Sequence, residues 1–198
     1  MRTRSLLFAC ILILSAAASP LMAADDDEKI QSLKEERKNI LLYGIDSQVS
    51  ELIDSLKTEK DNSFSPTLHE ILLSSVNTNL QVKILDFFSE TNYDKAHEDA
   101  YNLLLQYEDE REELILSLMR YLKKDVDKKV MQLLTELSTH EKDSIAVAAI
   151  DALGKAKDRK RAGEGLFELF NDDEVSVIRK QNIILAFGEL AYEPARDE

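Results

Sequence analysis

A short pattern that recurs at nearly constant spacing constrains this chain more than any other feature. The pattern combines apolar positions with an acid or a small residue and closes on a large apolar residue. Its five copies are Ile53-Asp54-Ser55-Leu56, Leu85-Asp86-Phe87-Phe88, Met119-Arg120-Tyr121-Leu122, Ile150-Asp151-Ala152-Leu153 and Ile184-Leu185-Ala186-Phe187. The closing residues are 32, 34, 31 and 34 residues apart. Such a period is typical of folds in which each unit buries its apolar face only against the next unit.

Between these copies the apolar residues follow the period of a helix. Val126, Val130, Leu133, Leu134 and Leu137 form a single stripe with helical spacing. Ser65-Pro66 and the capping box Thr78-Asn79-Leu80-Gln81 are start signals for helices. The chain has only 5 glycines and 3 prolines, and no segment alternates with a period of two, so we expect no strands.

The fold prediction is therefore all-α, an α-solenoid of about five antiparallel helix pairs. The predicted pairs cover residues 29–60, 65–91, 94–124, 126–157 and 160–192. The predicted helical repeat domain covers residues 25–198.

The last two repeats resemble HEAT repeats of the short bacterial kind that also occurs in phycobilisome-lyase-like proteins. Ala148–Asp158, with Leu153-Gly154, resembles the second helix of that family and its Leu-Gly exit. Asp172–Lys180, followed by Phe187-Gly188, resembles it again. The match covers about residues 140–195 and is weaker before them, because the first three pairs lack the Leu-Gly exit.

The resemblance implies ladders of Asp and Arg side chains between neighbouring repeats. Asp173 and Arg179 have the spacing of that pair, which gives them a structural role in stacking. Tetratricopeptide repeats share a period near 34 residues and are the second choice of architecture, although their helix-one Gly and Tyr pattern is not visible here.

Residues 1–24 have the features of a secretory signal peptide. Arg2 and Arg4 precede the apolar segment Leu6–Ala18, and Ala23-Ala24 offers a cleavage site before Asp25. About 20 residues are needed to span a bilayer, so this segment is too short for a typical anchor, and an uncleaved anchor is the less favoured alternative. Cys10 lies within the apolar segment, whereas a lipidated cysteine would close it, so lipidation is also the less favoured alternative. These features predict a periplasmic or secreted protein of a bacterial envelope.

Charge and motifs exclude several classes of function. The net charge is −13, and it falls to about −15 without the signal, which argues against nucleic acid as a partner. No later stretch is apolar enough to span a membrane. His69, His97 and His140 lack the second histidine of a zinc protease, so we expect them to be solvated surface residues. No nucleophile elbow or phosphate loop occurs, so we expect no enzyme activity, no catalytic or metal residues and no cofactor.

One basic cluster interrupts the acidic sequence between the fourth and fifth pairs. It consists of Lys155, Lys157, Arg159, Lys160 and Arg161. The cluster is either a solvated join or a docking point for an acidic partner or for anionic lipid headgroups. The last pair either caps the repeats or leaves an open face for a partner or a second copy of the chain.

The functional prediction is an exported scaffold or adaptor that binds a protein or peptide through its repeat surface. The alternatives are a lyase-like or regulatory accessory protein that carries a ligand, and a structural component that assembles with itself through the C-terminal repeat.

Overall fold

The computed structural model describes residues 21–109 and 111–193. Within these ranges the chain is helical, with one short 3₁₀ turn, as the sequence predicts. The helices are α1 (Leu21–Tyr43), α2 (Asp46–Glu59), α3 (Ser65–Ser74), α4 (Thr78–Thr91), α5 (His97–Leu104), η1 (Tyr107–Asp109), α6 (Glu112–Leu122), α7 (Lys128–Leu137), α8 (Asp143–Leu153), α9 (Arg159–Phe170) and α10 (Val177–Leu190). The only extended pairing among these residues is an isolated bridge between Val126 and Ala156.

The chain divides into two compact units, residues 1–38 and 39–198, and the division falls within α1. In the first unit, residues 21–38 form one continuous helix, on which Ile30 and Leu33 are exposed. Most of the predicted signal peptide, including Cys10, lies outside the described residues. No helix in the described part of the chain has both the length and the hydrophobicity needed to cross a membrane.

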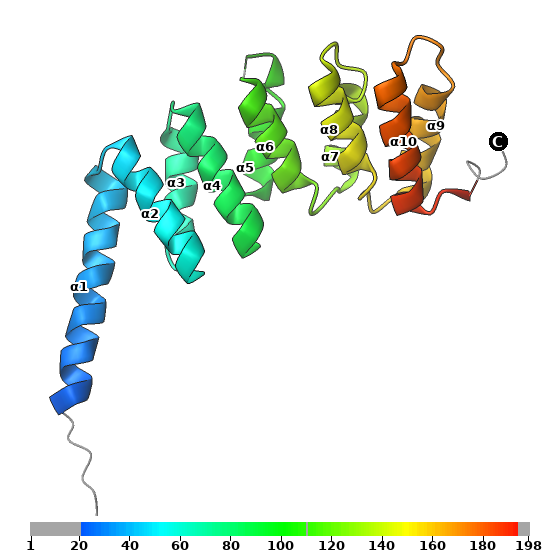
Figure 1. The fold of residues 1–198 in the computed structure, drawn as a ribbon. Helices are drawn as coiled ribbons and strands as arrows, with labels where there is room; N and C mark the ends of the chain where they lie inside the picture. The colour runs from blue at the N-terminus through cyan, green and yellow to red at the C-terminus, as the bar shows by residue number, and fades with distance from the viewer. Residues whose placement is uncertain (1–20, 110, 194–198) are drawn as a thin grey trace, which may run out of the picture. The chain divides into compact units, whose positions relative to one another are not determined.

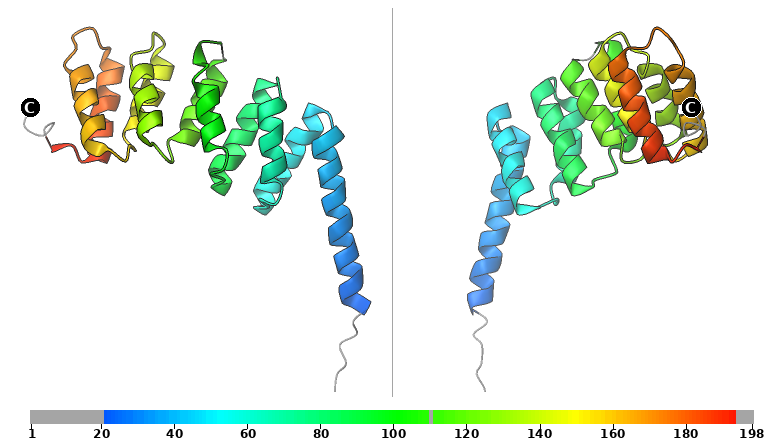
Figure 2. Two further views of the ribbon diagram at one scale, coloured as in Figure 1. Left: turned by 180° about the vertical axis from the view of Figure 1, so that it is seen from behind. Right: turned by 45° about the vertical axis from the view of Figure 1, so that its right-hand side comes forward.

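In the second unit, consecutive helices form pairs. Helix α3 packs on α4, α5 on α6, α7 on α8 and α9 on α10, with short joins between the two members (Figure 1). These four pairs agree with the predicted ranges from residue 65 onwards. The view from behind brings the odd-numbered members forward, from α3 in cyan-green to α9 in orange (Figure 2).

Contacts between pairs run mainly through the even-numbered helices. Helix α4 packs against both α2 and α6, and α8 packs against both α6 and α10. One hydrophobic cluster extends through the unit from Leu41 to Leu190. All five residues of the stripe from Val126 to Leu137 belong to it and are buried, as their spacing predicts.

Local sequence signals explain where several helices begin. Pro66 lies in the first turn of α3, where its missing N–H costs no hydrogen bond. The N-cap of α4 is Asn77, one residue before the predicted capping box, and its side chain accepts hydrogen bonds from the Asn79 and Leu80 amides. Asp127, Asp158 and Ser176 cap α7, α9 and α10 in the same way.

Candidate interaction surface

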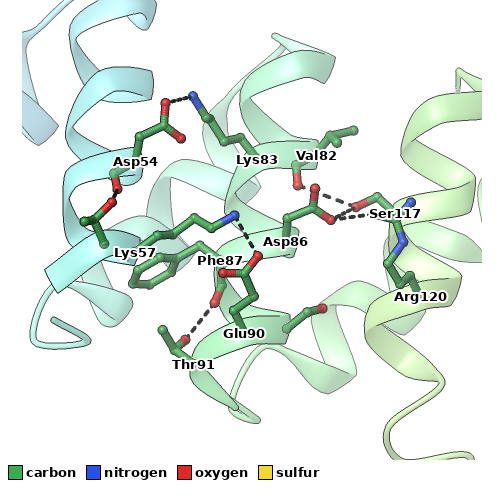
Figure 3. Close-up of polar contacts among 12 residues, drawn as sticks. Asp54, Lys57, Val82, Lys83, Asp86, Phe87, Glu90, Thr91, Ser117 and Arg120 are labelled. Atoms are coloured by element: carbon green, nitrogen blue, oxygen red, sulfur yellow. Dashed lines mark hydrogen bonds and ion pairs between the residues drawn. The ribbon is translucent and has the colours of Figure 1, made fainter. Parts of the chain in front are cut away.

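The acid of the repeated pattern forms ion pairs between neighbouring even-numbered helices. Asp54 on α2 contacts Lys83 on α4, with 2.6 Å between Oδ2 and Nζ (Figure 3). Asp86 on α4 contacts Arg120 on α6 at 2.7 Å, and Asp151 on α8 contacts Lys123, directly after α6, at 2.6 Å. Every acid of the pattern therefore binds a base about one repeat away in the sequence. We call this series of contacts the ion-pair ladder.

Two copies of the repeated pattern have another residue in place of the aspartate. In the third copy the position is Arg120, which binds the acid of the copy before it. In the last copy the position is Leu185, which is 68% exposed. The replacement of an acid by arginine in the third copy is therefore a charge exchange that preserves the ladder, whereas the last copy ends it.

A second contact accompanies the ladder at most interfaces. Lys57 contacts Glu90 at 2.7 Å, as Figure 3 also shows. Lys142 contacts Glu112 at 3.2 Å, and the Ser144 hydroxyl donates to the same carboxylate at 2.6 Å. Hydrogen bonds from Ser144 and Lys142 lower the pKa of Glu112 below its usual value, because they favour the charged form.

The ladder contributes more to helix alignment than to stability. Its acids Asp54 and Asp151 have exposed side chains, and exposed ion pairs typically contribute about 0–1 kcal/mol. Each pair nevertheless joins fixed positions on two helices, so it favours one relative alignment of those helices.

The predicted stacking residue Arg179 does join two helix pairs, but its acid is Asp143. The Arg179 Nε atom donates to Asp143 Oδ1 at 2.6 Å, across the interface between α10 and α8. Its Nη2 atom donates to the carbonyl oxygens of His140 at 2.8 Å and Glu141 at 3.3 Å. Asp173, the other residue predicted to act in stacking, is exposed in the join before α10. Spacing along the chain could not identify Asp143, because it lies 36 residues away.

The predicted basic cluster does not form one patch with a single role. Lys155 contacts Glu189 at 2.7 Å, and Lys157 contacts Asp125 at 2.5 Å, so both join helix pairs. Arg159 and Lys160 instead line a hollow of about 460 Å³ beside the C-terminal end of α10.

The fifth member, Arg161, lines a different hollow, between α7 and α9. Within the described residues, Arg159, Lys160 and Arg161 have no ion pair to another helix, so they are the members that remain open to a partner.

His69 is not the solvated surface residue that the sequence predicts, and the half-exposed His97 also contacts another helix pair. The His69 side chain is 17% exposed, and its Nε2 atom is hydrogen-bonded to Asp99 Oδ2 at 2.9 Å. The Nε2 atom of His97 donates to the Asp125 carbonyl at 2.8 Å. Both histidines therefore join neighbouring helix pairs. Among the described residues, no group of His, Cys, Asp or Glu side chains is placed to hold a metal ion.

Close to His69, a buried tyrosine reinforces the same interface. The Tyr121 hydroxyl donates to the Tyr93 carbonyl at 2.6 Å, and its ring lies against Phe88. Burial, together with the charge of Asp94, raises the pKa of Tyr121 to about 12. The tyrosine therefore stays neutral at all ordinary pH values.

The even-numbered helices leave a small groove between α6 and α8. Leu116, Met119 and Ala148 supply its apolar lining, and Arg120, Lys123 and Asp151 of the ladder supply its polar lining. The volume is about 210 Å³, which is the scale of one side chain and too small for a typical ligand pocket of about 300–1,000 Å³. The sequence could not reveal this groove, because its residues come from helices in two repeats.

The chain matches no protein-family model and no curated protein.

Proposed function

We propose that this protein is an exported, non-enzymatic scaffold or adaptor that binds a protein or peptide. In this proposal the helix pairs form a HEAT-like solenoid, and the even-numbered helices line its binding surface. The observation that carries the proposal is the ion-pair ladder, which aligns α2, α4, α6 and α8 through residues on adjacent helices. A surface that is aligned before binding loses less conformational entropy when a partner docks.

The groove between α6 and α8 is the docking point that we assign to this surface, because residues of the ladder line it. Its apolar lining, with Leu116 and Met119, suits an aliphatic side chain of the partner. Arg120 and Lys123 beside it offer N–H donors to a neighbouring carboxylate or backbone carbonyl. Repeated apolar and polar positions on successive helices would let several weak contacts add along an extended peptide.

Two measurements test the compartment and the architecture. Mass spectrometry of the native protein should find an N-terminus at Asp25 if the signal peptide is cleaved as the sequence predicts. Small-angle scattering should show an elongated particle, as expected for a solenoid. An intact Met1 or a compact, spherical particle would contradict the corresponding part of the proposal.

Site-specific photocrosslinking in cells tests the binding surface. We would place a crosslinking amino acid at Leu116, in the groove between α6 and α8, and at Gln132, in the hollow between α7 and α9. The proposal expects a reproducible product from position 116 that is lost when Ala148→Lys, at a partly exposed residue of the lining, fills the groove with charge. Equal yields at both positions, or no product at either, would contradict it. The Gln132 variant is the matched control, because it also lies in a hollow between two helices.

A further inference from the structure

One position of the repeated pattern connects neighbouring even-numbered helices in the first two interfaces. It lies five residues before the closing residue of each copy, and in chain order it is Glu51, Lys83, Ser117, Ala148 and Asn182. It also lies three residues before the position of the ladder acid, so the two positions share one side of the helix. We call it the bridging position.

Between α2 and α4, a lysine fills the bridging position. The Lys83 Nζ atom donates to Asp54 Oδ2 at 2.6 Å and to the Ser50 hydroxyl oxygen at 2.7 Å. Figure 3 shows this side chain extending from α4 towards α2. The bridging residue therefore contacts two positions of the preceding helix, the ladder acid and the residue four before it.

Between α4 and α6, a serine occupies the same position and meets the same two positions of the preceding helix. The Ser117 hydroxyl oxygen lies 3.5 Å from Asp86 Oδ1 and 3.5 Å from the Val82 carbonyl oxygen (Figure 3). Ser117 is only 1% exposed. In both interfaces, a side chain of the protein itself therefore occupies the space beside the ladder.

Between α6 and α8, the bridging residue is Ala148, which has no polar atom and only a methyl group. The two positions that a bridging residue would meet on α6 are Arg120 and Leu116, and both line the groove together with Ala148. The groove is therefore the bridging position left unfilled. On α10, Asn182 donates within its own helix, to the Ile178 carbonyl oxygen at 2.8 Å.

The charges that line the groove are already paired. Arg120 binds Asp86 at 2.7 Å, and Lys123 binds Asp151 at 2.6 Å. A carboxylate placed in the groove would lie near these two acids. An ammonium group would lie near Arg120, at the position where the first interface has Asp54. The group that complements this lining is therefore uncharged, because burying an unpaired charge is costly.

We propose that Ala148 determines the specificity of the partner-binding groove, which takes one uncharged aliphatic side chain of a peptide at the bridging position. The inference rests on the proposed function and names the chemistry of its partner. The peptide side chain occupies the place that Lys83 fills between α2 and α4, and Leu116 and Met119 supply its apolar contacts. A volume of about 210 Å³ fits one such side chain.

Methyl NMR titration of the full chain tests this chemistry. The probes are blocked pentapeptides, acetyl-Gly-Ser-X-Ser-Gly-amide, with leucine, lysine or glutamate at X. The Met119 methyl group lines the groove and reports binding, and Met131, which lines the hollow between α7 and α9, is the internal control. We expect the leucine peptide to shift the Met119 resonance saturably and to bind at least about fivefold more tightly than the charged peptides.

A pair of methionine substitutions on α8 tests the role of Ala148. Ala148→Met places an aliphatic side chain of the protein itself at the bridging position, so it should weaken binding of the leucine peptide at least about tenfold by occupying the groove. Val147→Met is the matched control, because Val147 is also partly exposed but does not line the groove. Circular dichroism and an unchanged Met131 resonance establish that both variants are folded.

Failure of this inference differs from failure of the proposed function. Equal binding of the three peptides, no shift at Met119, or equal effects of the two substitutions would overturn the role of Ala148, even if crosslinking from Leu116 in cells succeeds. Conversely, selective binding of the leucine peptide that only Ala148→Met removes would support the specificity, even if crosslinking in cells finds no partner.

Discussion

Arg179 should contribute more to stability than any basic residue of the ion-pair ladder. Its side chain is 13% exposed, and it donates to Asp143 and to the carbonyl oxygens of His140 and Glu141. The substitution Arg179→Met keeps the apolar stem and removes these donors. Arg120→Met is the matched control, because Arg120 also pairs with an aspartate between even-numbered helices but is 60% exposed.

The expected magnitudes follow from this difference in burial. Hydrogen bonds to charged groups typically contribute about 1.5–3 kcal/mol. Asp143 is half exposed, so solvent screening reduces its share to about 1 kcal/mol at most. The His140 and Glu141 carbonyl oxygens also lose their donor. The expected loss in the free energy of unfolding for Arg179→Met is therefore about 2–3 kcal/mol. Arg120→Met should cost about 0–1 kcal/mol, because that pair is at the surface.

Thermal unfolding and hydrogen exchange can measure this difference. In a chain of this size a loss of 1 kcal/mol lowers Tm by roughly 2–4 °C, so Arg179→Met should lower it by about 5–10 °C. Amide exchange should accelerate first in α9 and α10, because Arg179 joins that helix pair to α8. Equal Tm shifts for the two variants, or unchanged exchange in α10, would refute the reasoning.

Three further predictions follow from the contacts between helix pairs. Burial raises the pKa of Tyr121 from 10.0 to about 12, so the folded state favours the neutral hydroxyl. This preference should add about 2–3 kcal/mol to the free energy of unfolding below pH 10, and the added stability should be lost between pH 10 and 12. Tyr121→Phe should therefore make alkaline unfolding curves shallower in that window, and an unchanged slope would contradict this. Ser144→Ala should raise the pKa of the Glu112 carboxyl, as measured by NMR titration, because the variant loses the hydroxyl that donates to the charged form; an unmoved pKa would show that the bond is absent. Gly154→Val should destabilise the protein by about 1–3 kcal/mol, because α10 lies against Gly154. Gly188→Val should destabilise it less, because nothing lies within 4 Å of a Cβ atom there, and equal losses in denaturant unfolding would contradict this.

The histidines and the stacking pair show why local reasoning failed at particular positions. The absence of a second histidine one turn away argued against a zinc-protease motif, but it gave no information about Asp99, which lies 30 residues from His69. In the same way, the resemblance gave Arg179 a role in stacking but did not identify Asp143, which binds it. Both partners come from another repeat.

The sequence showed the aspartates of the ion-pair ladder but not the bases that bind them. Asp54, Asp86 and Asp151 belong to the repeated pattern, and the pattern predicted that their helices recur. Their lysine and arginine partners show no constant spacing, because they lie 29, 34 and 28 residues away and on either side of the acid. A pairwise search for bases about one repeat from each acid could have found them.

The sequence alone determined that the described chain is helical and where its pairs lie from residue 65 onwards. Apolar spacing, caps and the repeat period are properties of neighbouring residues, and they act before any tertiary contact forms. Only the tertiary structure decided which side chains meet across the pairs. Those outcomes depend on how one helix lies against the next, and small differences in that alignment change which of many exposed acids a base can reach.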